Sequence, residues 1–180
     1  MVQDTAYLAN AVKVYSEAAE NMEQQGKADF AQFYIRQAEK YDTYHKEFLE
    51  TWKLESAEAV HKGPAVQAYM GFQQVVAKQH PKYVPVAMLP CTMLWPWMAG
   101  SLIDGVHKQN PYYEDWFKPN WRAPGTQSST EKFVDEYFTP DDEGPALKIF
   151  CEGMMNELNF FREACGEAPV KLSDICPSAG

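Results

Sequence analysis

Residues 83–103 read YVPVAMLPCTMLWPWMAGSLI and carry no formal charge. By length alone, such an apolar run could cross a membrane. It contains three prolines and a glycine, however, and these favour a buried helix of a globular protein. We therefore expect residues 82–107 to form the central helix of the fold, kinked or interrupted at its prolines, and we expect no membrane partner.

On both sides of this segment, apolar residues recur at every third or fourth position, which is the period of an amphipathic helix. The pattern predicts helices at residues 4–24, 27–54, 65–78, 131–137 and 146–164. Neither an internal repeat nor the alternating pattern of β-strands interrupts this series. The sequence therefore predicts an all-α bundle that forms a single domain over residues 1–180.

The composition is that of a packed globular protein, with 46% hydrophobic and 23% charged residues. Its net charge of -9, without any basic run, argues against a nucleic-acid partner. The start, MVQDTAYLANAVKVY, lacks the basic and apolar regions of a secretory signal, so we expect a cytoplasmic protein. The four cysteines show no Cys-x-x-Cys spacing and are expected to be reduced, with a bridge between Cys165 and Cys176 left open.

Two carboxylates lie on faces that are otherwise apolar or aromatic. Glu157 shares a helix face with Phe150 and Phe160, and Asp4 lies close to Tyr7. Burial raises the pKa of a carboxyl group and makes it a candidate proton donor or acceptor near neutral pH. The alternative is that Glu157 reaches solvent at the edge of its stripe and that Asp4 is a solvated or capping residue.

Cys91 lies at the centre of the uncharged segment, directly after Pro90. A proline inside a helix frees nearby backbone groups and can open space around the following side chain. As a nucleophile, Cys91 would need a neighbour that stabilises its thiolate. The alternative is an inert cysteine that fills space in the core.

The histidines suggest a rival site, because three of the four follow an acidic residue at the acid-x-x-His spacing of di-iron bundles. The pairs are Asp42 with His45, Glu58 with His61, and Asp104 with His107. On one continuous helix the first two pairs would lie about 24 Å apart, at about 1.5 Å per residue. No phosphate-binding loop, nucleophile elbow, zinc-protease motif or dinucleotide fingerprint is present. We therefore expect neither a metal nor another cofactor.

Five stretches of the chain, taken together and in this order, resemble the TenA (thiaminase II) family. They are VQDTAYL, GPAVQAY, AMLPCTMLWPWMAGSLID, NPYYEDWF and ELNFFREA, which together cover nearly the whole chain. The stretch with Leu-Pro-Cys is the most specific. The resemblance implies a heme-oxygenase-like helical bundle that assembles as a homo-oligomer, a tetramer or a dimer. It also implies hydrolysis of aminopyrimidines in the salvage of the thiamin pyrimidine.

The resemblance also implies roles for individual residues. Cys91 would be the nucleophile that adds to the pyrimidine ring, and Glu157 the acid that protonates the departing amine and then activates water. Asp4 would bind the ring nitrogen and the exocyclic amine. Tyr7 and Phe160 would flank the ring on its two faces. Tyr69 would complete the polar pocket.

The sequence departs from the family pattern in three places. The family usually has a helix before the Gln-Asp motif, so we expect a bundle that lacks the usual first helix. Trp95 stands where the family has a tyrosine four residues after the cysteine, and we expect it to be one of the substrate-binding residues. A later family tyrosine is replaced by Asn120 or Trp121.

These observations leave three hypotheses for the function. The first is an aminopyrimidine aminohydrolase, or a close relative, that uses Cys91 and Glu157. The second is a TenA-like protein that binds a small heterocycle without turnover, because the tyrosine and first-helix changes removed it. The third is a di-iron oxidase of similar fold.

Overall fold

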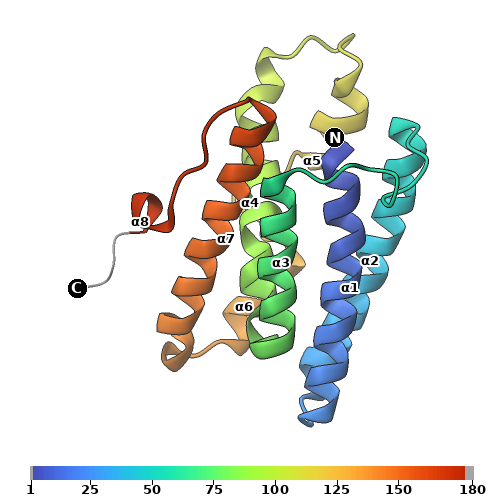
Figure 1. Ribbon diagram of the computed structural model, residues 1–180. Coiled ribbons are helices and arrows are strands. Elements are labelled where there is room, and N and C mark those ends of the chain that lie inside the picture. Colours follow the sequence, from blue (N-terminus) through green and yellow to red (C-terminus); the bar gives the residue numbers. More distant parts are fainter. Residues whose placement is uncertain (1, 177–180) are drawn as a thin grey trace.

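The computed structural model describes residues 2–176, and every regular element in this range is helical. The five long helices lie side by side as a bundle (Figure 1). They are α1 (Val2–Gln24), α2 (Ala28–Trp52), α3 (Pro64–Gln79), α4 (Val84–Leu102) and α7 (Glu143–Ala164). The predicted all-α class is confirmed.

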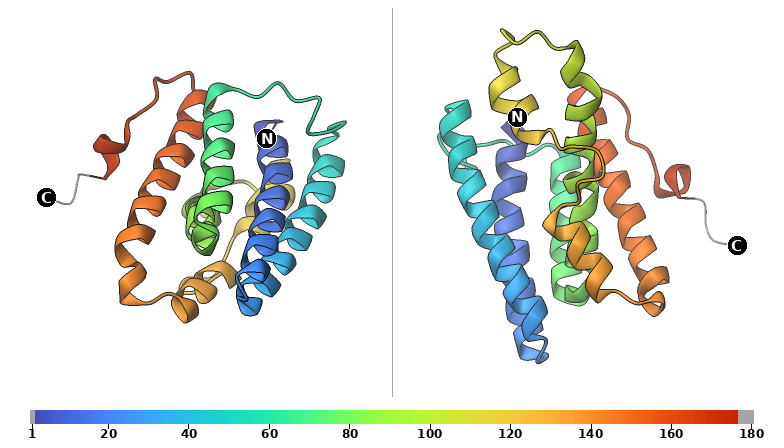
Figure 2. Two further views of the ribbon diagram at one scale, coloured as in Figure 1. Left: turned by 60° about the horizontal axis from the view of Figure 1, so that its bottom comes forward. Right: turned by 180° about the vertical axis from the view of Figure 1, so that it is seen from behind.

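Short elements connect and extend the long helices. Three single 3-10 turns are η1 (Pro81–Tyr83), η2 (Ile103–Gly105) and η4 (Pro140–Asp142), and a π-helical turn is η3 (Tyr113–Phe117). The short α-helices are α5 (Lys118–Asn120), α6 (Ser129–Tyr137) and α8 (Leu172–Ile175). Seen from behind, the segment from α5 to α6 runs across the bundle beside α4 (Figure 2).

Helix ends follow local chemistry. Gly26, with a φ of 71°, follows α1 and adopts the left-handed conformation that glycine tolerates best. Pro64 begins α3, and the Glu163 carboxylate of α7 accepts a hydrogen bond from the Ala65 N–H at 3.1 Å. An anion at this position satisfies a free N–H group and the positive end of the helix. The end of α7 is thereby fixed to the start of α3.

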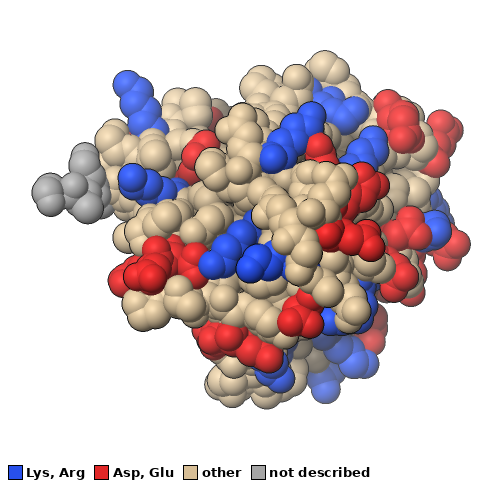
Figure 3. All heavy atoms as spheres, turned by 90° about the horizontal axis from the view of Figure 1, so that it is seen from below, with Lys and Arg blue, Asp and Glu red and all other residues tan. Residues whose placement is uncertain are grey.

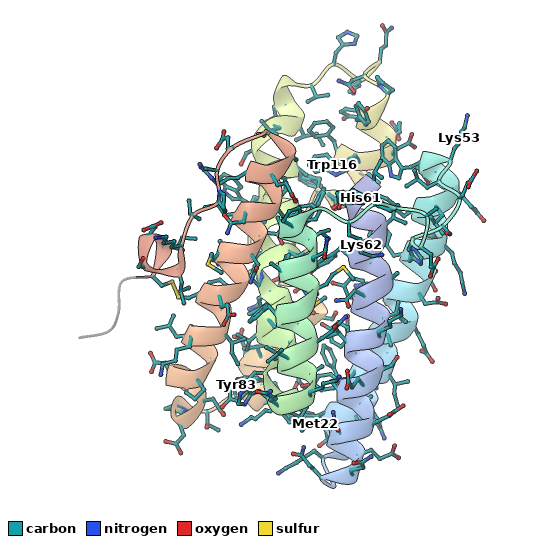
Figure 4. The ribbon with its side chains drawn as sticks, in the orientation of Figure 1. Met22, Lys53, His61, Lys62, Tyr83 and Trp116 are labelled. Carbon is teal, nitrogen blue, oxygen red and sulfur yellow. A yellow bond between two sulfur atoms is a disulfide. The ribbon has the colours of Figure 1, made fainter. Side chains whose placement is uncertain are left out.

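The core lies between α1, α2, α3 and α4, where α1 and α2 pack along their length. Its largest fully buried side chains include Tyr15, Tyr34 and Tyr69. Figure 4 shows the two ends of the bundle: Trp116 and His61 lie near the start of α1, and Met22 and Tyr83 lie at the opposite end. The candidate residues Asp4 and Tyr7 therefore belong to the same end as Trp116.

Helix α4 begins at Val84, close to the predicted start, but ends at Leu102, before the predicted limit of residue 107, and it continues through Pro90 and Pro96 without interruption. Residues 81–105 are the one segment in the described part of the chain that is long and apolar enough to cross a membrane by length and composition. Core helices of soluble proteins pass the same test. In this protein α4 packs against α3, α6 and α7, but only 28% of its apolar window is buried. An apolar face of α4 therefore remains exposed.

The prediction that all the cysteines are reduced is wrong for two of them. Cys151 of α7 and Cys176 after α8 form a disulfide, whereas Cys91 and Cys165 are free. The tail after α7 turns back along that helix, and the Asn159 side chain bonds both the N–H and the C=O of Val170. This return places Cys176 beside Cys151 and leaves Cys165 exposed at the turn.

The surface carries charges of both signs. On the end of the bundle seen from below, acidic side chains are interspersed with lysines and arginines (Figure 3). Among the described residues, most ion pairs are exposed, such as Lys46 with Asp42, and contribute little to stability. A more buried pair, Lys82 with Asp142 at 2.6 Å, links the start of α4 to the start of α7.

Candidate active site

A cavity of about 180 Å³ opens between α1, α2, α4 and the segment from α5 to α6. Asp4, Tyr7 and Leu8 line it from α1, and Cys91, Thr92, Trp95 and Pro96 line it from α4. Helix α2 adds Gln37, Lys40, Tyr41, Tyr44 and Phe48, and the segment after η3 adds Pro119, Asn120, Arg122 and Ser128–Thr130. Its walls combine aromatic rings with a few polar groups, as is typical of small-molecule sites.

The structure brings most of the predicted site residues together. Asp4, Tyr7, Cys91 and Trp95 line the cavity directly. Glu157 and Tyr69 do not line it, but both interact electrostatically with Cys91. The charge of Glu157 raises the pKa of the Cys91 thiol, and the charge of Cys91 raises the pKa of the Tyr69 hydroxyl. They form the layer behind the cavity wall.

Phe160 has a different place from the one predicted. It packs against the hydrophobic core and against Phe161, with ring centroids 6.2 Å apart, and is absent from the cavity wall. Of the two aromatic residues expected to flank a ring, only Tyr7 faces the cavity. Trp95 supplies a second aromatic face from α4. Its ring packs against the rings of Trp116 and Phe161, with centroids 5.4 Å and 5.9 Å away.

Glu157 is a buried acid, with 3% of its surface exposed. Burial raises the pKa of its carboxyl group from 4.5 to about 7, the Tyr69 hydroxyl opposes this shift, and the charge of Asp4 adds to it. The Tyr69 hydroxyl is itself buried and makes no hydrogen bond of good geometry. A carboxyl group with such a pKa can both donate and accept a proton near neutral pH.

Cys91 faces the cavity as a protonated thiol. Burial raises the pKa of the thiol well above its ordinary value, and the negative charge of Glu157 raises it further. The nearby Tyr7 hydroxyl and Trp95 indole N–H, which are hydrogen-bond donors, oppose the shift. Because no preformed thiolate is favoured here, the thiol must lose its proton as it attacks.

Asp4 lies in the first turn of α1 and is buried. Burial raises the pKa of its carboxyl group. Its charge acts on Glu157, Cys91 and Tyr44, whose pKa values it raises. The two carboxyl groups therefore share one electrostatic site with the thiol.

A buried polar network fixes the Tyr7 hydroxyl. The Gln73 amide of α3 donates to it at 2.9 Å, and Asn10 of α1 donates to the Gln73 oxygen at 3.1 Å. The Tyr7 ring lies 5.0 Å from that of Tyr69. Buried amides with satisfied partners hold a side chain in one orientation. Gln73 therefore positions Tyr7 against Cys91.

Gly153 explains why α7 comes so close to α4 at this point. A Cβ atom at Gly153 would lie 2.9 Å from the Pro90 Cγ and 3.4 Å from the Ala87 oxygen. Pro90 directly precedes Cys91, and Glu157 lies one helical turn after Gly153. The contact between a glycine and a proline ring therefore sets the approach of the acid to the thiol.

We expect Gly153→Ala to destabilise the protein and to weaken any activity that needs both Cys91 and Glu157. The added methyl group overpacks the contact with Pro90, which costs about 1–3 kcal/mol. Gly144→Ala is the matched control, because it lies on the same helix with no atom within 4 Å of an added Cβ. Urea unfolding of both variants measures the difference. Equal free energies of unfolding would contradict the proposed close packing.

The family model of the TENA/THI-4/PQQC family matches residues 1–137. The chain belongs to this family. The match includes Asp4, Tyr7, Tyr69, Cys91 and Trp95 and ends before α7, which carries Glu157. Membership confirms the predicted TenA-like assignment, and the helical bundle is the heme-oxygenase-like fold of this family. No curated protein matches the chain.

Within this TENA/THI-4/PQQC member, Trp95 takes the place of the expected tyrosine and still interacts with the thiol. Its interaction with Cys91 lowers the thiol pKa, in the same direction as that of Tyr7. The indole N–H is a hydrogen-bond donor, as the tyrosine hydroxyl would be. The substitution therefore changes the donor near Cys91 and does not remove it.

We expect Trp95→Phe to raise the pKa of Cys91, because phenylalanine keeps the aromatic face but has no N–H to donate. The rate of thiol alkylation by a small reagent, compared at each pH from 7 to 10, follows the fraction of thiolate, which falls as this pKa rises. A Cys91→Ala variant gives the background from Cys165, the other free cysteine. An unchanged alkylation profile in Trp95→Phe would show that the indole does not act on the thiol.

The aromatic stripe of α2 was missed as part of the site. The periodicity of residues 27–54 predicted only a helix, and its aromatic residues Tyr41, Tyr44 and Phe48 were not among the predicted site residues. The structure turns this stripe toward the cavity, where burial and the charges of Asp4 or Cys91 raise the pKa values of the tyrosines. The sequence shows the helical spacing of these residues, but it does not show that a cavity lies against them.

The three acid–histidine pairs do not converge on a metal site. Within residues 2–176, no group of three or more His, Cys, Asp or Glu residues could hold a metal ion. The first two pairs lie on α2 and on the connection between α2 and α3, and the third follows α4. The geometry gives the di-iron alternative no support.

Proposed function

We propose that this protein is an aminopyrimidine aminohydrolase of the thiaminase II type, acting on an aminopyrimidine or a related heterocycle. The TENA/THI-4/PQQC family includes hydrolases as well as other enzymes, so the reaction type rests on the site. One observation carries the proposal: Cys91 lines a cavity beside the buried carboxyl groups of Asp4 and Glu157, which come from two other helices.

In this reaction, the Cys91 sulfur adds to an electrophilic carbon of the ring. Asp4 hydrogen-bonds the ring nitrogen and the exocyclic amine, so that the ring accepts the electron pair and the thiol proton passes to the ring nitrogen. The Tyr7 and Trp95 rings hold the flat ligand in place. Because Glu157 lies behind the cavity wall, its proton passes to the departing amine directly or through one water, and the amine leaves as ammonia.

The second half of the reaction returns the enzyme to its starting state. The Glu157 carboxylate takes a proton from water, and the resulting hydroxide adds where the amine was bound. The carbon–sulfur bond breaks and the thiol regains its proton from the ring nitrogen. One amine and one water become one alcohol and one ammonia, with no change in oxidation state.

The test is the release of ammonia from an aminomethylpyrimidine, with thiamin as a second substrate. Enzyme-dependent ammonia or thiazole release that saturates with substrate supports the proposal. The alternative function is a TenA-like binding protein, favoured by the changes at Trp95 and Asn120. Micromolar binding in a calorimeter without any release would support that alternative and contradict the hydrolase.

The assembly and location remain part of the same proposal. We infer a cytoplasmic homo-oligomer, a dimer or tetramer, with no nucleic-acid or membrane partner. The exposed apolar face of α4 supports the assembly, since Trp97 is 67% exposed and Met93 and Leu102 are also largely exposed. Contiguous apolar residues on a surface often mark an interface. Light scattering of the purified protein measures the mass, and a strict monomer would contradict the inference.

A further inference from the structure

The cavity has a second end, which the proposed chemistry does not use. Along α2, Phe48 and Tyr44 face the cavity near Asp4. Gln37, seven residues before Tyr44, faces the cavity at its other end. There the Gln37 amide donates a hydrogen bond to the Ser129 hydroxyl at 3.2 Å. Seven residues of helix span about 10 Å. The cavity is therefore long enough for a ligand that extends well beyond one ring.

This second end gathers positive charge and hydrogen-bond donors. Lys40 and Arg122 line it, together with buried Gln37, buried Thr130 and Ser129. Lys40 is exposed, and the ion pairs within residues 2–176 do not include it. Arg122 lies 3.7 Å from Glu131, a carboxylate that also accepts the Ser128 N–H at 2.8 Å to cap α6. This pair involves one terminal nitrogen of Arg122, and the guanidinium carries further N–H donors that can face a ligand.

The helix that closes this end adds donors of its own. Ser129 and Thr130 form the first turn of α6, where backbone N–H groups have no partner within the helix. Among the described residues that line the cavity, Asp4 is the only carboxylate, and it lies at the opposite end. Two cations thus converge on one cavity in a chain with 25 acidic and 16 basic residues.

We propose that this end of the cavity binds a phosphate monoester carried by the heterocycle, so that the substrate is a phosphorylated derivative. This inference rests on the proposed function for the position of the ring. A phosphate has three terminal oxygens, which suit an arginine fork, a lysine and hydroxyl or backbone donors better than a carboxylate would. The phosphate would then hold the ligand along the cavity while its ring lies between Tyr7 and Trp95, beside Cys91.

The experiment compares thiamin with thiamin monophosphate, which differ only in the phosphate. Calorimetry on the full chain should show that the monophosphate binds about tenfold more tightly or better, since charge-assisted hydrogen bonds are the strong ones. In the double variant Lys40→Met/Arg122→Met this preference should disappear while thiamin binding is retained. Lys46→Met is the matched control, because Lys46 lies on α2 outside the cavity, paired with Asp42.

Equal affinity for the two ligands in the wild type, or a preference that survives in the double variant, would overturn the inference. A separate titration with inorganic phosphate distinguishes the anion site from the proposed function. If neither thiamin compound binds, the proposed function fails for these ligands. The phosphate site then stands only if phosphate binds the wild type and the Lys46→Met variant more tightly than the double variant, and it is overturned by any other result.

Discussion

Cys91→Ala is expected to lower the rate of ammonia release by about ten-thousandfold or more, because removing the nucleophile leaves only the contribution of binding and polarisation. Binding should survive, since Asp4, Tyr7 and Trp95 still line the cavity. The substitution removes one sulfur atom from a partly buried position, so the fold should also survive. Steady-state rates and calorimetric affinities, measured on the same preparation, separate the two effects.

Cys165→Ala is the matched control for this variant. Cys165 is the other free cysteine, is exposed and lies outside the cavity, so its loss should leave the rate unchanged. A Cys91→Ala protein that turns over at the wild-type rate would exclude a cysteine nucleophile. A variant that loses binding together with turnover would show instead that Cys91 shapes the pocket.

The helices could be predicted because burial imposes a period on the sequence. Apolar residues at every third or fourth position located α1, α2, α3 and α7 to within a few residues. The central helix was predicted to reach residue 107 but ends at Leu102, where η2 follows. A segment that is apolar all round has no polar face to mark its end.

The catalytic candidates could be predicted for a different reason. Glu157 was conspicuous as a carboxylate on an apolar stripe, and the structure does bury it. Cys91 and Asp4 were weaker candidates from their positions, because a lone cysteine or aspartate has no distinctive pattern, and the family resemblance gave each of them a role. Lys40 and Arg122 had no signal at all, since charged residues on an amphipathic helix or in a loop are ordinary surface residues.

Contacts between distant segments were beyond reach of the sequence. The disulfide joins Cys151 to Cys176, and nothing in their spacing favours this pair over the one left open between Cys165 and Cys176. The close approach of Gly153 to Pro90 likewise depends on how α7 crosses α4. Such contacts arise from packing, which helical periodicity does not encode.

Glu157→Gln is expected to lower the rate of ammonia release by about a hundredfold to ten-thousandfold, the usual contribution of a general acid or base. Glutamine keeps the size of the side chain but cannot transfer a proton. In the wild type, the protonated acid is present below its pKa of about 7 and lost above it. If protonation of the amine limits turnover, kcat should therefore fall as pH rises through 7, and the variant should lack this fall. Rates from pH 5 to pH 9 test this.

The same substitution has an independent effect on stability. The raised pKa means that folded Glu157 holds its proton between pH 4.5 and about 7, where the unfolded chain has released it. The free energy of unfolding of the wild type should therefore fall as pH rises through this window, by up to about 3 kcal/mol. Glu157→Gln removes this loss, including the part of it that comes from the charge of Asp4.

Urea unfolding at pH 5 and pH 8 measures this difference directly. Relative to the wild type, Glu157→Gln should gain free energy of unfolding at pH 8 compared with pH 5. Glu152→Gln is the matched control, because Glu152 lies on the same helix and is exposed. Glu152→Gln should keep the wild-type pH dependence of the free energy of unfolding. If Glu157→Gln keeps it too, Glu157 titrates as an ordinary solvated carboxylate. It could then not serve as a proton donor at neutral pH, and the proposed mechanism would lose its acid.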